Sequence, residues 1–218
     1  MKNFDFVLWD WNGTLLNDLE MNLEIVDALL SGHGLKGPVS KEFYLENFGF
    51  PVSKFYIKMG FDLSKEDFLL LADEYDREYL KRLPQTFLFE DAESALAALS
   101  GSGVHQAVIS ATKHERLIPQ VRDYNVEKYF DAVLGTENNL GNGKTAVAAQ
   151  WLRSSGANPE RTVFIGDTLH DLECAKKIGC TCFFIARGHN SKEKLLATGC
   201  EVFDDISQAA ARILGSTN

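Results

Sequence analysis

The feature that most constrains the fold is a short apolar run near the N-terminus that ends in polar residues. Residues 6–9 read Phe-Val-Leu-Trp and are followed at once by Asp10, Trp11, Asn12 and Gly13. A strand without alternation of polar and apolar residues is usually covered on both faces, as in a parallel sheet. Ligands of open α/β sheets bind just beyond the carboxyl ends of such strands. We therefore expect Asp10 to lie at a binding edge, although such residues before a glycine also form ordinary turns.

Composition excludes several classes of partner. The chain has 218 residues and a formal net charge of -9, so it lacks the basic excess of a surface for nucleic acid or an anionic membrane. Its length suits one large domain or a domain with an insert. Residues 1–3 lead into an apolar segment too short for a secretory signal or a membrane span, which favours a cytoplasmic protein. The oligomeric state stays open, and a monomer is compatible with the sequence.

The cysteines indicate free thiols. Cys174, Cys180, Cys182 and Cys200 lie in the last quarter of the chain, without the paired C-x-x-C spacing of a zinc site. Buried free thiols are therefore favoured over a disulfide or a metal role.

Residues 17–86 have a helical pattern and no convincing strand. Leu19 to Leu30 has the spacing of one helix face, with Asp18 placed to cap its start. Two short helices are expected at 41–48 and 53–59, and the sequence Ser64 to Asp67 resembles a capping box that opens a longer helix. We expect an inserted helical subdomain.

The aromatic residues of this insert are most simply its core. Only the loop Gly49-Phe50-Pro51, between the two short helices, is a candidate to face a substrate.

Beyond residue 89 strands and helices alternate, which is typical of a parallel sheet with right-handed crossovers. The expected strands are 106–110, 132–135, 162–167 and 181–185, and the expected helices are 92–100, 117–124, 144–155, 172–178 and 205–214. The predicted fold class is α/β, a three-layer Rossmann-like parallel sheet. Its core comprises residues 1–16 and 87–218, and residues 17–86 form the helical insert.

A second group of acids follows the strand at 162–167. Asp167 and Asp171 stand four residues apart, directly after Gly166. Two clustered carboxylates repel one another, and a hard divalent cation is the usual way to stabilise them. If Asp10 ends a neighbouring strand, three carboxylates converge into a Mg²⁺ site. Alternatively, Asp171 only caps the following helix.

Two further residues could hold an anion. Ser110 ends the expected strand 106–110, where its hydroxyl could bind a phosphoryl oxygen, and Thr112 is a second candidate at the same edge. Lys144 opens a helix, so both its ammonium group and the helix N-terminus could face an anion.

Four segments together resemble the haloacid dehalogenase-like hydrolases, a superfamily of aspartate-nucleophile phosphatases. D-W-N-G-T-L at 10–15 resembles their D-x-D-G-T-L motif, and Gly166 to Asp171 matches their G-D-x-x-x-D motif. Ser110 and Lys144 match the second and third motifs, in the same order along the chain. The helical insert falls where that family has a cap. Residues 129–133 and 187–189 are similar to phosphoglycolate phosphatase-like members.

The resemblance implies Mg²⁺-dependent hydrolysis of a small phosphorylated metabolite. Asp10 would be the nucleophile, and Asp10, Asp167, Asp171 and the backbone carbonyl of Asn12 would hold the metal. Asn12 stands where the family has a second aspartate that protonates the leaving group. Since an amide cannot exchange that proton, we expect a slow phosphatase, or one whose substrates have stable leaving groups.

Two alternatives remain open. Asn12 is also compatible with a module that binds phosphorylated ligands without turnover. Hydrolysis of a carbon–halogen bond would use an aspartate nucleophile too, but it needs no metal, which disfavours it beside Asp167 and Asp171. Among the histidines, His170 and His189 lie near the expected site, and His170 is a candidate substitute proton donor.

Overall fold

The computed structural model describes residues 4–137 and 143–215 and contains one six-stranded sheet. Its strand order is β5-β4-β1-β6-β7-β8, and every neighbouring pair is parallel. The strands are β1 (Phe6–Trp9), β4 (His105–Lys113), β5 (Ala132–Thr136), β6 (Thr162–Gly166), β7 (Thr181–Ile185) and β8 (Glu201–Phe203). Because β1 lies between β4 and β6, the polar residues at their carboxyl ends share one edge.

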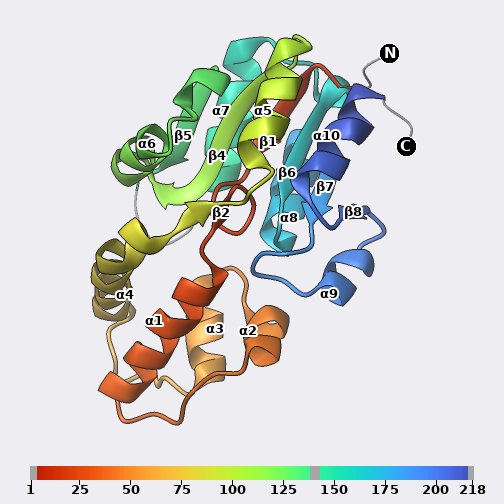
Figure 1. Ribbon diagram of the computed structural model, residues 1–218. Coiled ribbons are helices and arrows are strands. Elements are labelled where there is room, and N and C mark those ends of the chain that lie inside the picture. The colour runs from red at the N-terminus through yellow and green to blue at the C-terminus, as the bar shows by residue number, and fades with distance from the viewer. Residues whose placement is uncertain (1–3, 138–142, 216–218) are drawn as a thin grey trace.

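Helices cover both faces of this sheet (Figure 1). One face packs against α5 (Ala92–Gly101), α6 (His114–Asp123) and α10 (Ile206–Leu214). The other packs against α7 (Lys144–Ser155) and α8 (Leu169–Ile178), and α9 (Lys192–Leu196) lies beside β8. Successive side chains of β1 enter opposite layers, as the pleat requires. The predicted three-layer α/β fold is confirmed.

Four further helices have a hydrophobic cluster of their own and lie beyond one end of the sheet (Figure 1). These helices, named the helical insert below, are α1 (Leu19–Gly32), α2 (Lys41–Asn47), α3 (Val52–Met59) and α4 (Phe68–Arg82). The chain enters and leaves the insert through β2 (Leu16–Asn17) and β3 (Phe87–Leu88), which pair antiparallel. Single 3-10 turns occur at Leu83–Gln85, Glu127–Tyr129 and Pro159–Arg161.

Some local predictions were wrong or incomplete. Ser64 opens no helix, because its hydroxyl donates to Asp62 at 2.6 Å, and the carboxylate of Asp67 accepts from Leu69 N at 2.9 Å to cap α4 instead. Asp67 caps α4 in place of Ser64, because an aspartate next to the first helical turn can accept directly from the free backbone amides of that turn. The strands β2, β3 and β8 and the helix α9 were missed; each has five residues or fewer, too few for a periodic pattern.

The four cysteines are all free, as predicted, although only Cys174 and Cys182 are buried and Cys180 and Cys200 are partly exposed. No helix within the described ranges is both long enough and apolar enough to cross a membrane.

Candidate active site

Three carboxylates from distant parts of the chain meet at the carboxyl edge of the sheet. Asp10 directly follows β1, Asp167 directly follows β6, and Asp171 lies in the first turn of α8. One oxygen from each lies within 4.8 Å of the others, and all three residues are buried. The structure therefore brings together the three acids that the sequence pointed to, and hard oxygen ligands of this kind suit a divalent cation.

Lys144 links two of these acids. It is the first residue of α7 and only 2% exposed. Its Nζ donates to Asp10 Oδ1 at 2.6 Å and to Asp171 Oδ1 at 2.5 Å. Burial by itself would lower the pKa of Lys144, but the charges of Asp10 and Asp171 outweigh it and raise that pKa. The lysine is thus a fixed cation between the two carboxylates.

The three acids differ in how readily they ionise. Burial raises the pKa of Asp10 well above its ordinary value, despite the attraction of Lys144. Burial likewise raises the pKa of Asp167 to about 6. For Asp171 the burial penalty is outweighed by Lys144 and by hydrogen bonds from Thr168, so its pKa is lowered. Two of the three acids are therefore harder to ionise than an exposed aspartate, chiefly because they are buried.

Glycine allows the acids to approach one another. A Cβ atom on Gly166 would lie 2.2 Å from the carboxyl carbon of Asp171. Asp171 Oδ2 accepts from Thr168 N at 2.9 Å and from Thr168 Oγ1 at 2.8 Å, which closes a capping box at the start of α8. Asp171 therefore caps its helix with one oxygen and contacts Lys144 with the other, so the two interpretations of this residue are compatible.

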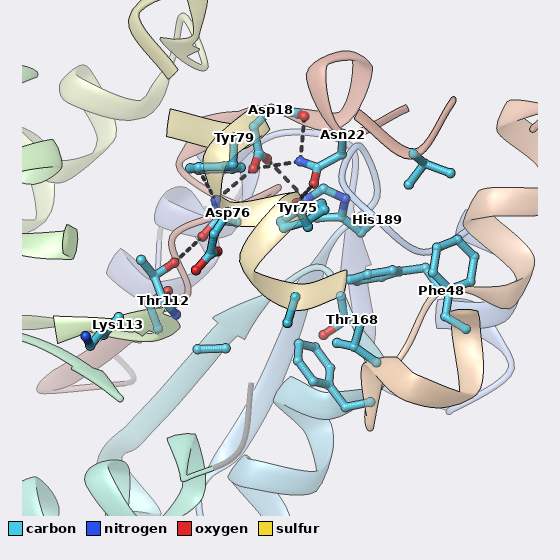
Figure 2. Close-up of a pocket in the computed structure, with 18 of the residues that line it drawn as sticks. Asp18, Asn22, Phe48, Tyr75, Asp76, Tyr79, Thr112, Lys113, Thr168 and His189 are labelled. Carbon is cyan, nitrogen blue, oxygen red and sulfur yellow. Dashed lines mark hydrogen bonds and ion pairs between the residues drawn. The ribbon is translucent and has the colours of Figure 1, made fainter. Parts of the chain in front are cut away.

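Asn12 is held by three hydrogen bonds. Its Nδ2 donates to Asp18 Oδ2 and to Tyr79 Oη, both at 2.7 Å, and its Oδ1 accepts from Thr112 Oγ1 at 2.8 Å. Figure 2 shows the side chains of Asp18, Tyr79 and Thr112 on the same side of the pocket. Because the amide donates two of these bonds, a carboxylate at position 12 could make neither, and a protonated carboxyl group could donate only one of them.

The prediction that the side chain of Asp18 caps α1 was wrong. Its carboxylate makes no capping hydrogen bond and instead accepts from Gly13 N at 2.9 Å and from His189 Nε2 at 3.1 Å. Asn12 and Asn22 donate to its other oxygen. Helix capping was the simpler explanation of an aspartate at this position, but the ion pair with the buried His189 holds the carboxylate turned back toward the sheet edge.

Burial would lower the pKa of His189, but the adjacent Asp18 carboxylate raises it to about 9. Burial in turn would raise the pKa of Asp18, but His189 and the other donors lower it. This buried ion pair was missed from the sequence. Two features of the sequence could have indicated it: Asp18 follows the first motif by three residues, and His189 follows the strand β7.

The Asp18–His189 pair predicts a pH dependence of stability. His189 stabilises the fold fully below its unfolded pKa near 6.5, and this contribution is lost as pH rises through about 9. Asp18 contributes above its ordinary value of 3.8, and its contribution is lost in acid. We expect the free energy of unfolding in urea to fall by on the order of 3 kcal/mol between pH 6.5 and 10, at about 1.4 kcal/mol per pKa unit. In His189→Gln this fall in the free energy of unfolding above pH 6.5 should be much smaller. An equal fall in the variant would contradict the assignment of the effect to His189.

The other candidate residues have different surroundings. Ser110 is buried, its Oγ accepts from Thr112 N at 3.1 Å, and both residues line the same cavity as Asp10 and Lys144. His170 does not line that cavity. Its Nδ1 pairs with Glu173 at 3.3 Å, its ring packs 4.5 Å from that of Phe50, and burial lowers its pKa. Because it does not line the cavity, His170 is poorly placed as a proton donor to a ligand there.

A cavity of about 180 Å³ lies between the sheet edge and the helical insert. Asp10, Asn12, Ser110, Lys144 and His189 line it from the sheet side. The insert lines it with aromatic residues that were expected to be simply core: Tyr44, Phe48, Phe55, Tyr56, Phe68, Tyr75 and Tyr79. Phe50 lines it too, and it belongs to the loop that was the candidate to face a substrate.

The insert contacts the sheet side of the molecule directly. Asn190 Nδ2 donates to the carbonyl oxygen of Phe48 at 3.0 Å, and Tyr44 Oη and His189 Nδ1 are hydrogen-bonded at 3.1 Å. Arg116 of α6 donates to Asp76 of α4 at 2.5 Å. These contacts hold the aromatic residues of the insert over the acids.

The parallel sheet, the acids at its edge and the bridging lysine define a hydrolase-type α/β protein with a covered polar site. The chain belongs to the haloacid dehalogenase-like hydrolase family, whose model matches residues 7–185.

Known proteins resemble the chain over different lengths. A phosphoglycolate phosphatase of Salmonella choleraesuis is 28% identical over 145 residues, which are 65% of this chain and 57% of that protein. The chain thus spans little more than half the length of this curated relative. A 5'-nucleotidase of Pseudomonas aeruginosa is 28% identical over 200 residues, 88% of this chain and 86% of that one. A haloacid dehalogenase-like protein from Streptococcus pneumoniae has the same fold, with a TM-score of 0.82, 19% identity, and coverage of 97% and 99% of the two chains.

Proposed function

We propose that the chain is a Mg²⁺-dependent phosphatase that hydrolyses a small phosphorylated metabolite, similar to phosphoglycolate phosphatase. The observation that carries the proposal is the buried contact of Lys144 with both Asp10 and Asp171 beside Asp167. In such a cluster a nucleophile, a cation and metal ligands would be within reach of one phosphoryl group. Membership in the hydrolase family and the phosphatases among the relatives support it.

The residues at the site suit a divalent cation. Asp10, Asp18, Asp167 and Asp171 are four buried acids, and Lys144 and His189 are two buried cations, so the fully ionised cluster carries two excess negative charges. Burial is the main cause of the raised pKa values of Asp10 and Asp167, and the neighbouring carboxylates add to it. Asp10, Asp167, Asp171 and the carbonyl of Asn12 would hold Mg²⁺, which would supply positive charge beside the phosphoryl oxygens.

The chain's own residues account for the two chemical steps. A carboxylate oxygen of Asp10 attacks phosphorus, the P–O bond to the leaving group breaks, and an aspartyl-phosphate forms while the released alkoxide takes a proton from water. Water then attacks this phosphorus and releases phosphate, which restores the carboxylate. Lys144 and the Ser110 hydroxyl offset charge on the phosphoryl oxygens throughout.

Asn12 sets the expected rate. It lies beside the site but has no proton to give, since its amide hydrogens are not acidic. A positioned acid or base contributes about 10² to 10⁴ in rate. We therefore propose a slow enzyme on ordinary alcohol esters, and a faster one on acyl phosphates or anhydrides, whose leaving groups need no proton.

The hydrogen bonds that fix Asn12 support a second candidate, a module that binds phosphorylated ligands without turnover. Phosphate release by purified protein from a panel of phosphorylated metabolites, with and without Mg²⁺, separates the two. Release that requires Mg²⁺ supports the phosphatase, whereas Mg²⁺-dependent binding without release supports the second candidate. Hydrolysis of a carbon–halogen bond stays disfavoured, because it would leave Asp167 and Asp171 without a role.

Magnesium should stabilise the protein. A ligand that binds only the folded state at 100 times its Kd adds about 2.7 kcal/mol to the free energy of unfolding. We expect Mg²⁺ to raise the melting temperature, measured by differential scanning fluorimetry, and Asp167→Asn to remove most of that rise. Asp73→Asn, the same change at an exposed position of α4, should keep it. Equal responses in the two variants would argue against a metal site at the acids.

We further propose that residues 17–86 act as a cap that selects the substrate, on a core of residues 1–16 and 87–218. The separate hydrophobic cluster of the insert and its place above the acids support this division. The cytoplasmic location and the monomeric state stay predictions.

A further inference from the structure

The wall of the cavity formed by the helical insert is mainly aromatic. Phe48 packs against Phe50 and Phe55, with ring centroids 5.9 and 5.5 Å apart and the rings edge to face. Val52 and Phe68 line the same cavity. In Figure 2, Phe48 lies across the pocket from Thr112 and Lys113. Because these rings pack on one another, the apolar wall is formed before any ligand binds.

The cavity, which has to hold the phosphoryl group as well, has space for at most one ring. Its volume is about 180 Å³, and an engineered apolar cavity of about 150 Å³ in another protein is large enough to bind benzene. An aromatic ring against this wall would be buried on the side opposite the phosphoryl group.

The charges around the cavity disfavour a second anionic group. Among the described residues that line it, the insert contributes no Lys, Arg or His. Each cation that lines the cavity from the sheet side forms an ion pair. Lys144 pairs with Asp10 and Asp171, and His189 pairs with Asp18. Arg116 pairs with Asp76 at 2.5 Å, and Lys113 pairs with Glu115 at 2.7 Å.

A carboxylate on the leaving group would have to break one of these pairs or lie beside Asp18 and Asp76. Breaking a buried pair of Lys144 or His189, or burying a carboxylate beside two others, is costly. Of these pairs, only Lys113–Glu115 is exposed enough to break at little cost, and it lies on the side of the cavity away from Phe48 (Figure 2).

We infer that the site takes phosphate monoesters whose leaving alcohol is uncharged and carries a single aromatic ring. This substrate class rests on the proposed phosphatase function. The ring would pack against Phe48, Phe55 and Phe68, while the phosphoryl group faces Asp10 and Lys144. The site would discriminate against 2-phosphoglycolate, whose leaving group carries a carboxylate, so the similarity to phosphoglycolate phosphatase would extend to the chemistry and not to the substrate.

Binding without turnover tests this class directly. In the Asp10→Asn variant with Mg²⁺, isothermal titration calorimetry gives the Kd of three phosphate esters of primary alcohols: 2-phenylethyl phosphate, ethyl phosphate and 2-phosphoglycolate. We expect 2-phenylethyl phosphate to bind at least about 10-fold more tightly than either of the others, from the apolar area that its ring buries.

Two variants in the same background locate the effect. Phe68→Ala should lower the affinity ratio of 2-phenylethyl to ethyl phosphate at least about 5-fold, whereas Phe43→Ala, on the exposed side of α2 and outside the cavity lining, should leave the ratio unchanged. Asp76→Asn removes the carboxylate partner of Arg116 and should improve binding of 2-phosphoglycolate relative to 2-phenylethyl phosphate.

Equal affinities for the phenylethyl and ethyl esters, or tightest binding of 2-phosphoglycolate, would overturn the inference. Phosphate release by the wild-type protein is measured separately. Its absence for all three esters and for acyl phosphates would contradict the proposed phosphatase function, while the binding ratios would still decide the class of ligand.

Discussion

Replacing Asp10 by asparagine is expected to lower phosphate release by at least about 10⁴-fold, because an amide oxygen is too weak a nucleophile to form the aspartyl-phosphate. The loss should appear in kcat with any leaving group, since the attacking atom is missing for all of them. Steady-state release from p-nitrophenyl phosphate with Mg²⁺ measures it.

The variant should remain folded. The amide oxygen introduced at position 10 can still accept a hydrogen bond from Lys144, and the substitution removes a carboxylate whose ionisation burial opposes. We therefore expect a melting temperature no lower than that of the wild type. Asp123→Asn, at an exposed position at the end of α6, is the matched control and should retain full activity. Substantial turnover by Asp10→Asn would exclude Asp10 as the nucleophile.

The part of the site that was predictable from the sequence lies at the ends of strands. Asp10 and Asp167 each follow a continuous apolar run, and parallel strands place their carboxyl ends at one edge. The order of the strands is a tertiary property, so the residues alone left the meeting of these acids conditional on Asp10 ending a neighbouring strand. The resemblance to the hydrolase family implied that arrangement. The α/β fold was predictable for the same reason, because its strands and helices alternate with strong periodicity.

The contacts that the sequence did not reveal depend on how the insert sits on the sheet. From its neighbours in the sequence, Asp18 is predicted to cap a helix. Its contact with His189 forms only in the folded chain. The aromatic residues of the insert have the spacing of a core, and Tyr44 and Phe55 are indeed buried in one. They also line the cavity because the loop before α3 contacts Asn190. Neither the Asp18–His189 pair nor the aromatic lining of the cavity produces a periodic pattern of residues in the sequence.

Asn12→Asp is expected to raise turnover where the leaving group needs a proton. The new carboxyl group would replace an amide that lies 2.7 Å from Asp18 Oδ2. Two carboxylates this close cannot both ionise freely, so the pair should retain a proton near neutral pH. A retained proton beside the phosphoryl site is what an alkoxide leaving group requires, and a positioned acid contributes about 10²-fold or more.

The dependence on the leaving group distinguishes this effect from a general change in the site. For ethyl phosphate we expect kcat to rise about 10²-fold, and for p-nitrophenyl phosphate no more than about 3-fold, since nitrophenolate departs without a proton. Asn22→Asp is the matched control, because Asn22 also donates to Asp18, at 3.0 Å, but from α1. It adds the same charge to the same neighbour and should not raise kcat. An equal gain for both esters, or an equal gain in the control, would mean that position 12 does not supply the missing proton.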